Sequence, residues 1–563
     1  MKLLQLIFIF CLLVTISNAQ EKGVFSGGYE TNANIFIRDS LIGADNIPQY
    51  DRQLFGAEGW FNLNYRYDGF EIGMRYDYFN NSNLLNPNSS YTDQGLGRWY
   101  LKKKVNKLGI TIGHIYDQLG SGIIYRAFES RPLLIDNALV GARLTYDLGE
   151  NWHAKVFTGK QRFLFGTNDG VIKGAGLEGF HKFSEESSLT LAPGIGFVNR
   201  TLSDASMDQV IEVLQGYQEI DQVTPVYNVY LATLYNTMIY KGFSWYVEGA
   251  YKTAEVYNDI FALKTELDGT ETLGKFVKKS GNVFYSSLSY ARKGLGITVE
   301  AKRTENFNFR SDPNLNLNFG LINFIPPMNR QNTYRLTARY SPATQDLSEF
   351  GYQADIRYKL NKKLSFLLNY SNITNLDGDA LYNEIYTEVV FKQKRDWQLS
   401  GGVQLQQYNQ ETYEGKSEAP TVRTITPYLD FLYKISRKKS VRIESQYMYM
   451  YDPDRVDDPT KEYFKQDYGD WFFALAEFGM APHWIFEVSG MFNVTPGKIS
   501  PTDSETGEKL KIFYPTVGIY YTNKANRYGL RYVKQVEGVV CSGGICRLEP
   551  AFSGFKFNVT SNF

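Results

Sequence analysis

The chain has 563 residues, and its 60 Lys and Arg balance its 60 Asp and Glu. A formal net charge of zero argues against nucleic acid as a partner, because nucleic-acid binding needs a basic surface. Aromatic residues make up 15% of the chain, and its many tyrosines suit the boundary between a membrane and water. No linker or low-complexity tract follows the first twenty residues, so we expect one domain over residues 20–563.

Residues 1–19 have the three parts of a secretory signal peptide. Lys2 supplies the positive charge, residues 3–16 the apolar core, and residues 17–19 (Ser-Asn-Ala) the small residues before a cleavage site. The apolar run is too short to favour a membrane helix, and no later run of about 18 apolar residues occurs. The sequence therefore predicts an exported protein without a spanning helix.

Alternating polar and apolar residues begin at the first candidate strand, residues 24–38, and are clearest in a hairpin over residues 60–79. Asp68-Gly69 lies between the two arms of this hairpin, which is the strongest short hairpin signal. Along the second arm five apolar or aromatic residues share one face and three charged residues share the other: Phe70, Ile72, Met74, Tyr76 and Tyr78 against Glu71, Arg75 and Asp77. Lipid outside and water inside a barrel would produce this division, but a water-soluble sandwich would produce it too.

The lengths of the connections favour the barrel. Short turns alternate with long loops along the chain, for example 68–69, 106–107 and 241–242 against 117–137, 201–225 and 253–280. Bacterial outer-membrane barrels have short periplasmic turns and long external loops, whereas a sandwich has no reason to keep this alternation. We predict an all-β, transmembrane antiparallel β-barrel in the outer membrane, with both termini periplasmic.

Parity constrains the number of strands, because termini on the same side require an even number. A first count gives about 25 strands, which breaks this rule. Assigning residues 314–325 to a further strand, with Pro326-Pro327 in a periplasmic turn, restores an even number. We therefore predict about 26 strands, within a range of about 24 to 26.

Later strands repeat the two-faced pattern. In residues 351–360 four polar side chains alternate with aromatic or aliphatic ones: Gln353, Asp355, Arg357 and Lys359. A Lys or Arg at the lipid midplane would cost roughly 2–4 kcal/mol, so we expect these side chains to point inward.

The last strand, residues 554–563, ends on the aromatic carboxy-terminal Phe563. Such an ending is typical of outer-membrane barrels, whose last strand carries the assembly signal. We therefore expect the barrel assembly machinery, outer-membrane lipid and lipopolysaccharide as partners.

Two external loops have features of their own. Residues 201–225 carry apolar residues at helical spacing (Met207, Val210, Ile211 and Leu214), which predicts a short amphipathic helix that lies over the barrel mouth or packs on neighbouring loops. Residues 117–137 hold Arg126, Glu129 and Arg131. These charges could select solutes inside a lumen, or they could form an ion cluster that fixes the loop.

Two cysteines follow the signal peptide, Cys541 and Cys546, with Gly-Gly between them. Because an exported protein folds in an oxidising compartment, we predict a disulfide that closes a short loop. A metal site would need two further ligands, and none is near.

Catalytic signals are weak. His114 lies near Asp117, but no serine sits in a nucleophile motif. The acidic runs at residues 452–458 and 377–379 match no calcium loop, so solvated loops are the favoured interpretation. We predict no enzymatic activity, no cofactor and no metal.

Four stretches carry a family resemblance: residues 24–32, 117–137, 142–162 and 539–563. Together they resemble an uncharacterised outer-membrane protein family of the Bacteroidota, which implies a barrel and an outer-membrane location and no activity. No plug domain precedes residue 24, so any plug would come from loops or from a partner, and a TonB-dependent receptor is disfavoured. We expect a channel or transporter with a loop-restricted lumen; the alternative is a structural or scaffold subunit of an envelope secretion or assembly complex.

Overall fold

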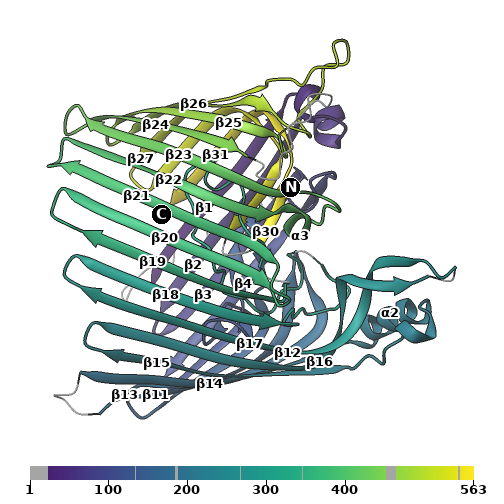
Figure 1. Ribbon diagram of the computed structural model, residues 1–563. Helices are drawn as coiled ribbons and strands as arrows, with labels where there is room; N and C mark the ends of the chain where they lie inside the picture. Colours follow the sequence, from purple (N-terminus) through teal and green to yellow (C-terminus); the bar gives the residue numbers. More distant parts are fainter. Residues whose placement is uncertain are drawn as a thin grey trace, which may run out of the picture.

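The structure, a computed structural model, describes residues 23–133, 135–183, 188–266, 268–316, 318–344, 347–451, 465–542 and 545–563. In it 24 long antiparallel strands form one closed barrel (Figure 1). In chain order they are β1 (Val24–Phe36), β2 (Phe55–Tyr67), β3 (Phe70–Ser82), β4 (Tyr91–Val105), β5 (Leu108–Ile115), β10 (Leu139–Leu148), β11 (Trp152–Phe163), β12 (Gly166–Gly179), β14 (Leu189–Thr201), β15 (Asn228–Tyr240), β16 (Phe243–Thr265), β17 (Glu271–Arg292), β18 (Leu295–Glu305), β19 (Glu349–Lys359), β20 (Leu364–Asn375), β21 (Ala380–Gln393), β22 (Trp397–Asn409), β23 (Thr421–Lys434), β24 (Lys439–Met450), β25 (Gly469–Met480), β26 (Trp484–Pro496), β27 (Phe513–Asn523), β28 (Asn526–Gln535) and β31 (Phe552–Asn562).

Shorter elements lie between these strands. The short strands are β6 (Gln118–Leu119), β7 (Tyr125–Arg126), β8 (Glu129–Ser130), β9 (Ile135–Asp136), β13 (His181–Lys182), β29 (Gly538–Ser542) and β30 (Ile545–Glu549). The helical elements are η1 (Ser40–Ile42), η2 (Gln49–Gln53), η3 (Arg131–Leu133), α2 (Asp204–Gln215), η4 (Glu219–Asp221) and α3 (Gln410–Glu414). No helix in the described part of the chain is long and apolar enough to cross a membrane. The predicted signal peptide lies outside the described residues.

The last strand closes the barrel, because β31 pairs with β28 on one side and with β1 on the other. The Phe563 amide donates to the Gly27 carbonyl at 3.0 Å, and the Gly27 amide donates back to the Phe563 carbonyl at 2.9 Å. A closed ring leaves no unpaired strand edge. The predicted antiparallel barrel is confirmed, and its even strand number lies at the lower end of the predicted range. The role of Phe563 in assembly stays a prediction.

The extra strand predicted over residues 314–325 is wrong. The described residues of this stretch contain no strand, and their backbone makes only one isolated bridge, between Arg310 and Leu321. Ile322 and Ile325 are both buried, so the apolar residues here do not alternate between two faces as strand residues do. The stretch belongs to a connection that folds into the barrel.

Both ends of the barrel wall lie on the side of the short turns. Val24 pairs with Arg66, next to the turn at residues 68–69, and Asn562 pairs with Gly28. The short turns lie on the left of Figure 1 and the long connections on the right. That the short-turn side is periplasmic stays a prediction.

The two faces of the wall strands carry different kinds of side chain, as β3 illustrates. The Met74 side chain is 53% exposed on the outer face, whereas the neighbouring Arg75 is 1% exposed on the inner face. At mid-strand in β15, Leu234 is 67% exposed on the outside. A closed barrel satisfies its backbone hydrogen-bonding groups within a lipid bilayer, and an apolar outer face suits the surrounding lipid. The chain is therefore an outer-membrane β-barrel.

Strands β16 and β17 continue past the barrel wall as a two-stranded arm, and α2 packs on this arm at the right of Figure 1. Val210 and Leu214 of α2 contact Val256 and Phe276 of the arm. Ser203 caps the helix by accepting from the Ser206 amide at 3.1 Å. The helix prediction is confirmed. Of its two predicted positions, packing on a neighbouring connection is correct, and lying over the barrel mouth is not.

Candidate functional site

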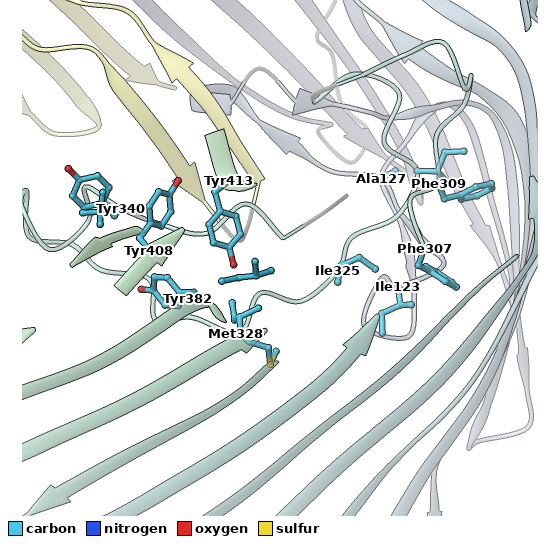
Figure 2. Close-up of a cluster of buried hydrophobic side chains, with 14 of the residues drawn as sticks. Ile123, Ala127, Phe307, Phe309, Ile325, Met328, Tyr340, Tyr382, Tyr408 and Tyr413 are labelled. Carbon is cyan, nitrogen blue, oxygen red and sulfur yellow. The ribbon is translucent and has the colours of Figure 1, made fainter. Parts of the chain in front are cut away.

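Three connections fold back into the barrel. They are the lumen loop (residues 116–138, between β5 and β10), the lumen segment (residues 306–348, between β18 and β19) and the disulfide hairpin (residues 538–549, between β28 and β31). Figure 2 shows part of the apolar cluster that the first two connections form with the wall: Ile123 and Ala127 of the lumen loop, Phe307, Phe309, Ile325, Met328 and Tyr340 of the lumen segment, and Tyr382 and Tyr408 of the wall, with Tyr413 of α3. The largest hydrophobic core therefore lies inside the barrel.

The lumen loop and the lumen segment are joined through their backbones. The Arg126 amide donates to the Ile322 carbonyl at 2.8 Å, and the Phe324 amide donates to the Gly122 carbonyl at 3.0 Å. Asn137 adds a side-chain hydrogen bond to the Leu321 carbonyl at 2.9 Å. The two connections therefore form one internal body.

Glutamine side chains of the wall hold the far half of the lumen segment. Gln404 donates to the Thr337 carbonyl at 2.9 Å, and Gln406 donates to the Tyr340 carbonyl at 2.7 Å. Gln446 accepts from the Leu336 amide at 2.7 Å. These amides replace water for backbone groups that have no sheet partner, so the segment spans the lumen to strands β22 and β24.

A buried ion cluster fixes the lumen loop to the wall. Arg75 donates to both carboxylate oxygens of Asp77, at 2.6 and 2.9 Å, and to Glu129 at 2.8 Å and Asp136 at 2.9 Å. Arg162 pairs with Asp77 at 3.0 Å and also with Asp136. Burial opposes ionisation of Asp136, but the charges of Arg162 and Arg75 outweigh it and lower the pKa of this carboxyl.

The predicted residues Glu129 and Arg131 meet at the edge of this cluster. Arg131 donates to Glu129 at 2.9 Å, pairs with Glu30 of β1, and places its guanidinium 4.9 Å from the Trp60 ring centroid. Both side chains thus contribute to anchoring the loop. Selection of solutes by these residues stays a prediction.

Arg126, the third predicted residue, lies apart from the other two. Its guanidinium stacks between the rings of Phe128 and Phe324, at 4.9 and 4.2 Å from their centroids. It forms no ion pair within the part of the chain that the structure describes, and burial lowers the pKa of Arg126.

The disulfide hairpin reaches the end of the lumen segment. Cys541 and Cys546 are bonded, as predicted. Gln331 donates to the Cys541 carbonyl at 3.4 Å, and the Cys541 sulfur lies 3.3 Å from the Ser341 carbonyl oxygen. The bond therefore closes a hairpin that packs against residues 331–341.

Three adjoining cavities run past this contact, and the innermost of them lies against strands β25–β28 and β31. A vestibule of about 680 Å³ lies among the long connections, next to Leu85, Tyr413 and Leu548. It shares Arg339 and residues 537–539 with a middle cavity of about 280 Å³. The middle cavity in turn shares residues with an inner chamber of about 330 Å³.

The inner chamber has a charged lining. The lumen segment contributes Arg335, and the wall contributes Glu487, Arg531, Lys534 and Lys556, with Glu549 of the disulfide hairpin. The chamber reaches Glu487, which lies toward the short-turn end of β26. The middle cavity between the vestibule and this chamber is lined mainly by the lumen segment and by residues 535–541.

Neither the lumen segment nor its Arg335 was predicted from sequence patterns. The available signal was its length, because a connection of this size inside a compact domain is uncommon and usually functional. Its apolar residues and Pro326-Pro327 also fit an external loop poorly.

The remaining candidate groups lie in structural surroundings. His114 is buried in β5, with its Nδ1 3.1 Å from the Trp99 carbonyl oxygen. Asp379 accepts from Asn375 in a tight turn at 2.8 Å. The acidic run at residues 452–458 falls outside the described residues. Across the described ranges no three His, Cys, Asp or Glu side chains are placed to hold a metal.

Comparison with solved structures returns large outer-membrane proteins. The siderophore receptor PirA from Pseudomonas aeruginosa is 10% identical, with 97% of this chain and 81% of that chain covered and a TM-score of 0.40. The outer membrane transporter YddB from Escherichia coli is 7% identical, at 97% and 81% coverage and a TM-score of 0.40. The usher PapC translocation pore is 9% identical, at 96% and 99% coverage and a TM-score of 0.40. At these values function must be argued from the residues of this chain.

No curated protein matches the sequence. A family model does match it, over residues 1–563, with the description "Family of unknown function (DUF6029)". The predicted origin in the Bacteroidota stays a prediction. The chain belongs to the DUF6029 family.

Proposed function

We propose that the protein is an outer-membrane channel or transporter whose lumen is closed by its own connections. The observation that carries this proposal is the run of three adjoining cavities that passes the lumen segment and the disulfide hairpin. A barrel of more than about 16 strands encloses a real lumen, which proteins leave open or plug. Here the plug is made by the lumen loop, the lumen segment and the disulfide hairpin.

The ends of the lumen segment make the proposal testable. Strands β18 and β19 pair as far as Thr304 and Glu349, and the Asn306 amide donates to the Ser348 hydroxyl at 2.9 Å. Because the two ends meet, residues 307–347 can be replaced by a short Gly-Ser turn without separating the strands. We expect this deletion to give large, porin-like conductance steps in planar bilayers, whereas the full chain gives small or infrequent steps.

A deletion outside the lumen serves as the control. Residues 503–508 form the exposed tip of the β26–β27 connection, and the flanking Thr502 and Lys509 are bridged. Removing this tip should leave the conductance of the full chain unchanged. If the folded 307–347 deletion stays closed to ions, the channel proposal is wrong.

The arm favours a second candidate, a structural or scaffold subunit of an envelope complex. Beyond the barrel it presents exposed apolar side chains, among them Ile260 and Leu273, and Ile220 of η4 is exposed beside it. Large exposed apolar patches mark contact sites for partners. Stoichiometric co-purification of envelope proteins from native membranes, lost on shortening the arm, would support this candidate over the channel.

A further inference from the structure

The inner chamber contains two guanidinium groups without a carboxylate partner. Arg335 reaches it from the lumen segment, and Arg531 reaches it from strand β28. Neither forms an ion pair with any residue that the structure describes. The other two cations of the lining are engaged: Lys534 pairs with Asp39 at 2.6 Å, and Lys556 lies 3.9 Å from Glu549.

The register of the wall places two of these cations directly opposite each other. Arg531 of β28 pairs with Lys556 of β31, and like charges opposite each other destabilise an antiparallel pair. The arrangement concentrates positive charge at one point of the lumen.

The carboxylates of the chamber offset this charge only in part. Glu549 lies next to Lys556, and Glu487 accepts from the Tyr520 hydroxyl at 3.0 Å and faces no cation at ion-pair distance within the described ranges. Neither carboxylate lies within ion-pair distance of Arg335 or Arg531. A guanidinium presents two parallel donors that match the oxygens of a carboxylate or a phosphate.

We propose that the inner chamber is a binding site for an oxyanion, a solute that carries a carboxylate or phosphate group, held between Arg335 and Arg531. This inference rests on the proposed channel or transporter function, because it names the class of solute that would pass. The chamber lies past the disulfide hairpin from the vestibule, so an anion that enters from the vestibule meets this site after the hairpin contact.

Calorimetric titration of the full chain in detergent tests the site without requiring conduction. Inorganic phosphate and succinate are titrated separately at constant ionic strength, which distinguishes the two kinds of oxyanion. We expect at least one to bind, and we expect Arg531→Gln and Arg335→Gln each to weaken binding about tenfold, since each removes a charge-assisted contact. Arg527→Gln is the matched control, because Arg527 lies on the same face of β28 and does not line the chamber.

Heat-dependent gel migration reports whether each variant has assembled into a folded barrel. Because the two variants lie on different elements, the test stays decisive if one of them fails to assemble. Binding that is absent for both oxyanions, or that weakens equally in Arg527→Gln, overturns the inference. Oxyanion binding together with a silent 307–347 deletion would refute the channel and leave the site. Conductance of the 307–347 deletion without oxyanion binding to the full chain would refute the site and leave the channel proposal.

Discussion

Single charged residues in the lumen act by joining wall strands to connections that are distant in sequence. Arg75 of β3 holds Glu129 and Asp136 of the lumen loop as well as Asp77 on its own strand. A buried pair contributes little over an apolar replacement, but removing one partner leaves a buried charge uncompensated. The structural importance of Arg75 therefore lies in the carboxylates that depend on it.

Replacing this arginine by an apolar residue of similar length should release the lumen loop. We expect Arg75→Met to cost about 3–5 kcal/mol in the free energy of unfolding and to speed hydrogen exchange in residues 116–138. Arg66→Met is the control, because Arg66 pairs with Glu71 on the surface with its side chain 70% exposed, and such pairs contribute about 0–1 kcal/mol. Equal losses in the two variants would contradict the anchoring role.

The sequence predicts part of this cluster. The alternation in residues 70–79 places Arg75 and Asp77 on one face, and the structure confirms that this face is the lumen. The partners Glu129 and Asp136 could not be assigned, because they belong to a connection more than fifty residues away, whose path into the barrel leaves no periodic signal.

At the scale of elements, the lumen segment depends on side chains of the wall for its backbone hydrogen bonds. Gln446 accepts from the amide of Leu336, and Gln404 donates to the carbonyl of the next residue, Thr337. A buried backbone group that loses its partner costs about 1–3 kcal/mol. These glutamines therefore set how readily the middle of the segment detaches.

The double variant Gln404→Leu/Gln446→Leu should loosen residues 331–341. We expect the local free energy of opening to fall by about 1–3 kcal/mol for each glutamine lost, read as faster amide exchange confined to this stretch. Gln398→Leu, on the same face of β22, bonds Ser400 and not the lumen segment, so exchange in residues 331–341 should be unchanged. Unaltered protection in the double variant would show that the wall glutamines do not hold the segment.

The lumen segment could not be predicted from the sequence, for a physical reason. Strand prediction requires alternation, and residues 314–325 were assigned to the wall because the strand number had to be even. The parity rule was correct, since the barrel has 24 strands. The even number is reached with fewer strands than the first count, and not by adding a strand. Apolar residues that pack inside a barrel resemble those of an irregular core, which has no period to detect.

At the scale of the whole molecule, the barrel separates lipid from lumen residue by residue. In β19 an added Cβ at Gly351 would lie 2.9 Å from Met328 of the lumen segment, so the odd-numbered positions face inward. Tyr352 is exposed on the other side. The composition and the alternation of short turns with long loops were sufficient to predict this division. They could not predict that connections fill the lumen.

Adjacent substitutions in the middle of β19 test the division at one depth. An arginine on the lipid side costs roughly 2–4 kcal/mol near the bilayer midplane, so we expect Ala354→Arg to lower the free energy of unfolding in lipid vesicles by that amount. Gln353→Arg points to the wet interior and should change it by about 0.5 kcal/mol or less. A larger loss for Gln353→Arg would reverse the assignment of the two faces.

The central claim is that residues 306–348 fold inside a closed barrel, and disulfide cross-linking in intact outer membranes tests it most directly. A Cβ added at Gly351 would lie 2.9 Å from the Met328 Cβ. A disulfide-bonded pair has about 3.5–4.5 Å between its Cβ atoms, so the two cysteines are near enough to bond once the lumen segment shifts slightly away from β19. We predict that Met328→Cys/Gly351→Cys forms the cross-link under mild oxidation, and that Met328→Cys/Ala354→Cys, whose second cysteine faces lipid, does not. Absence of the first cross-link in the folded barrel, or equal formation of both, would contradict a lumen filled by this segment.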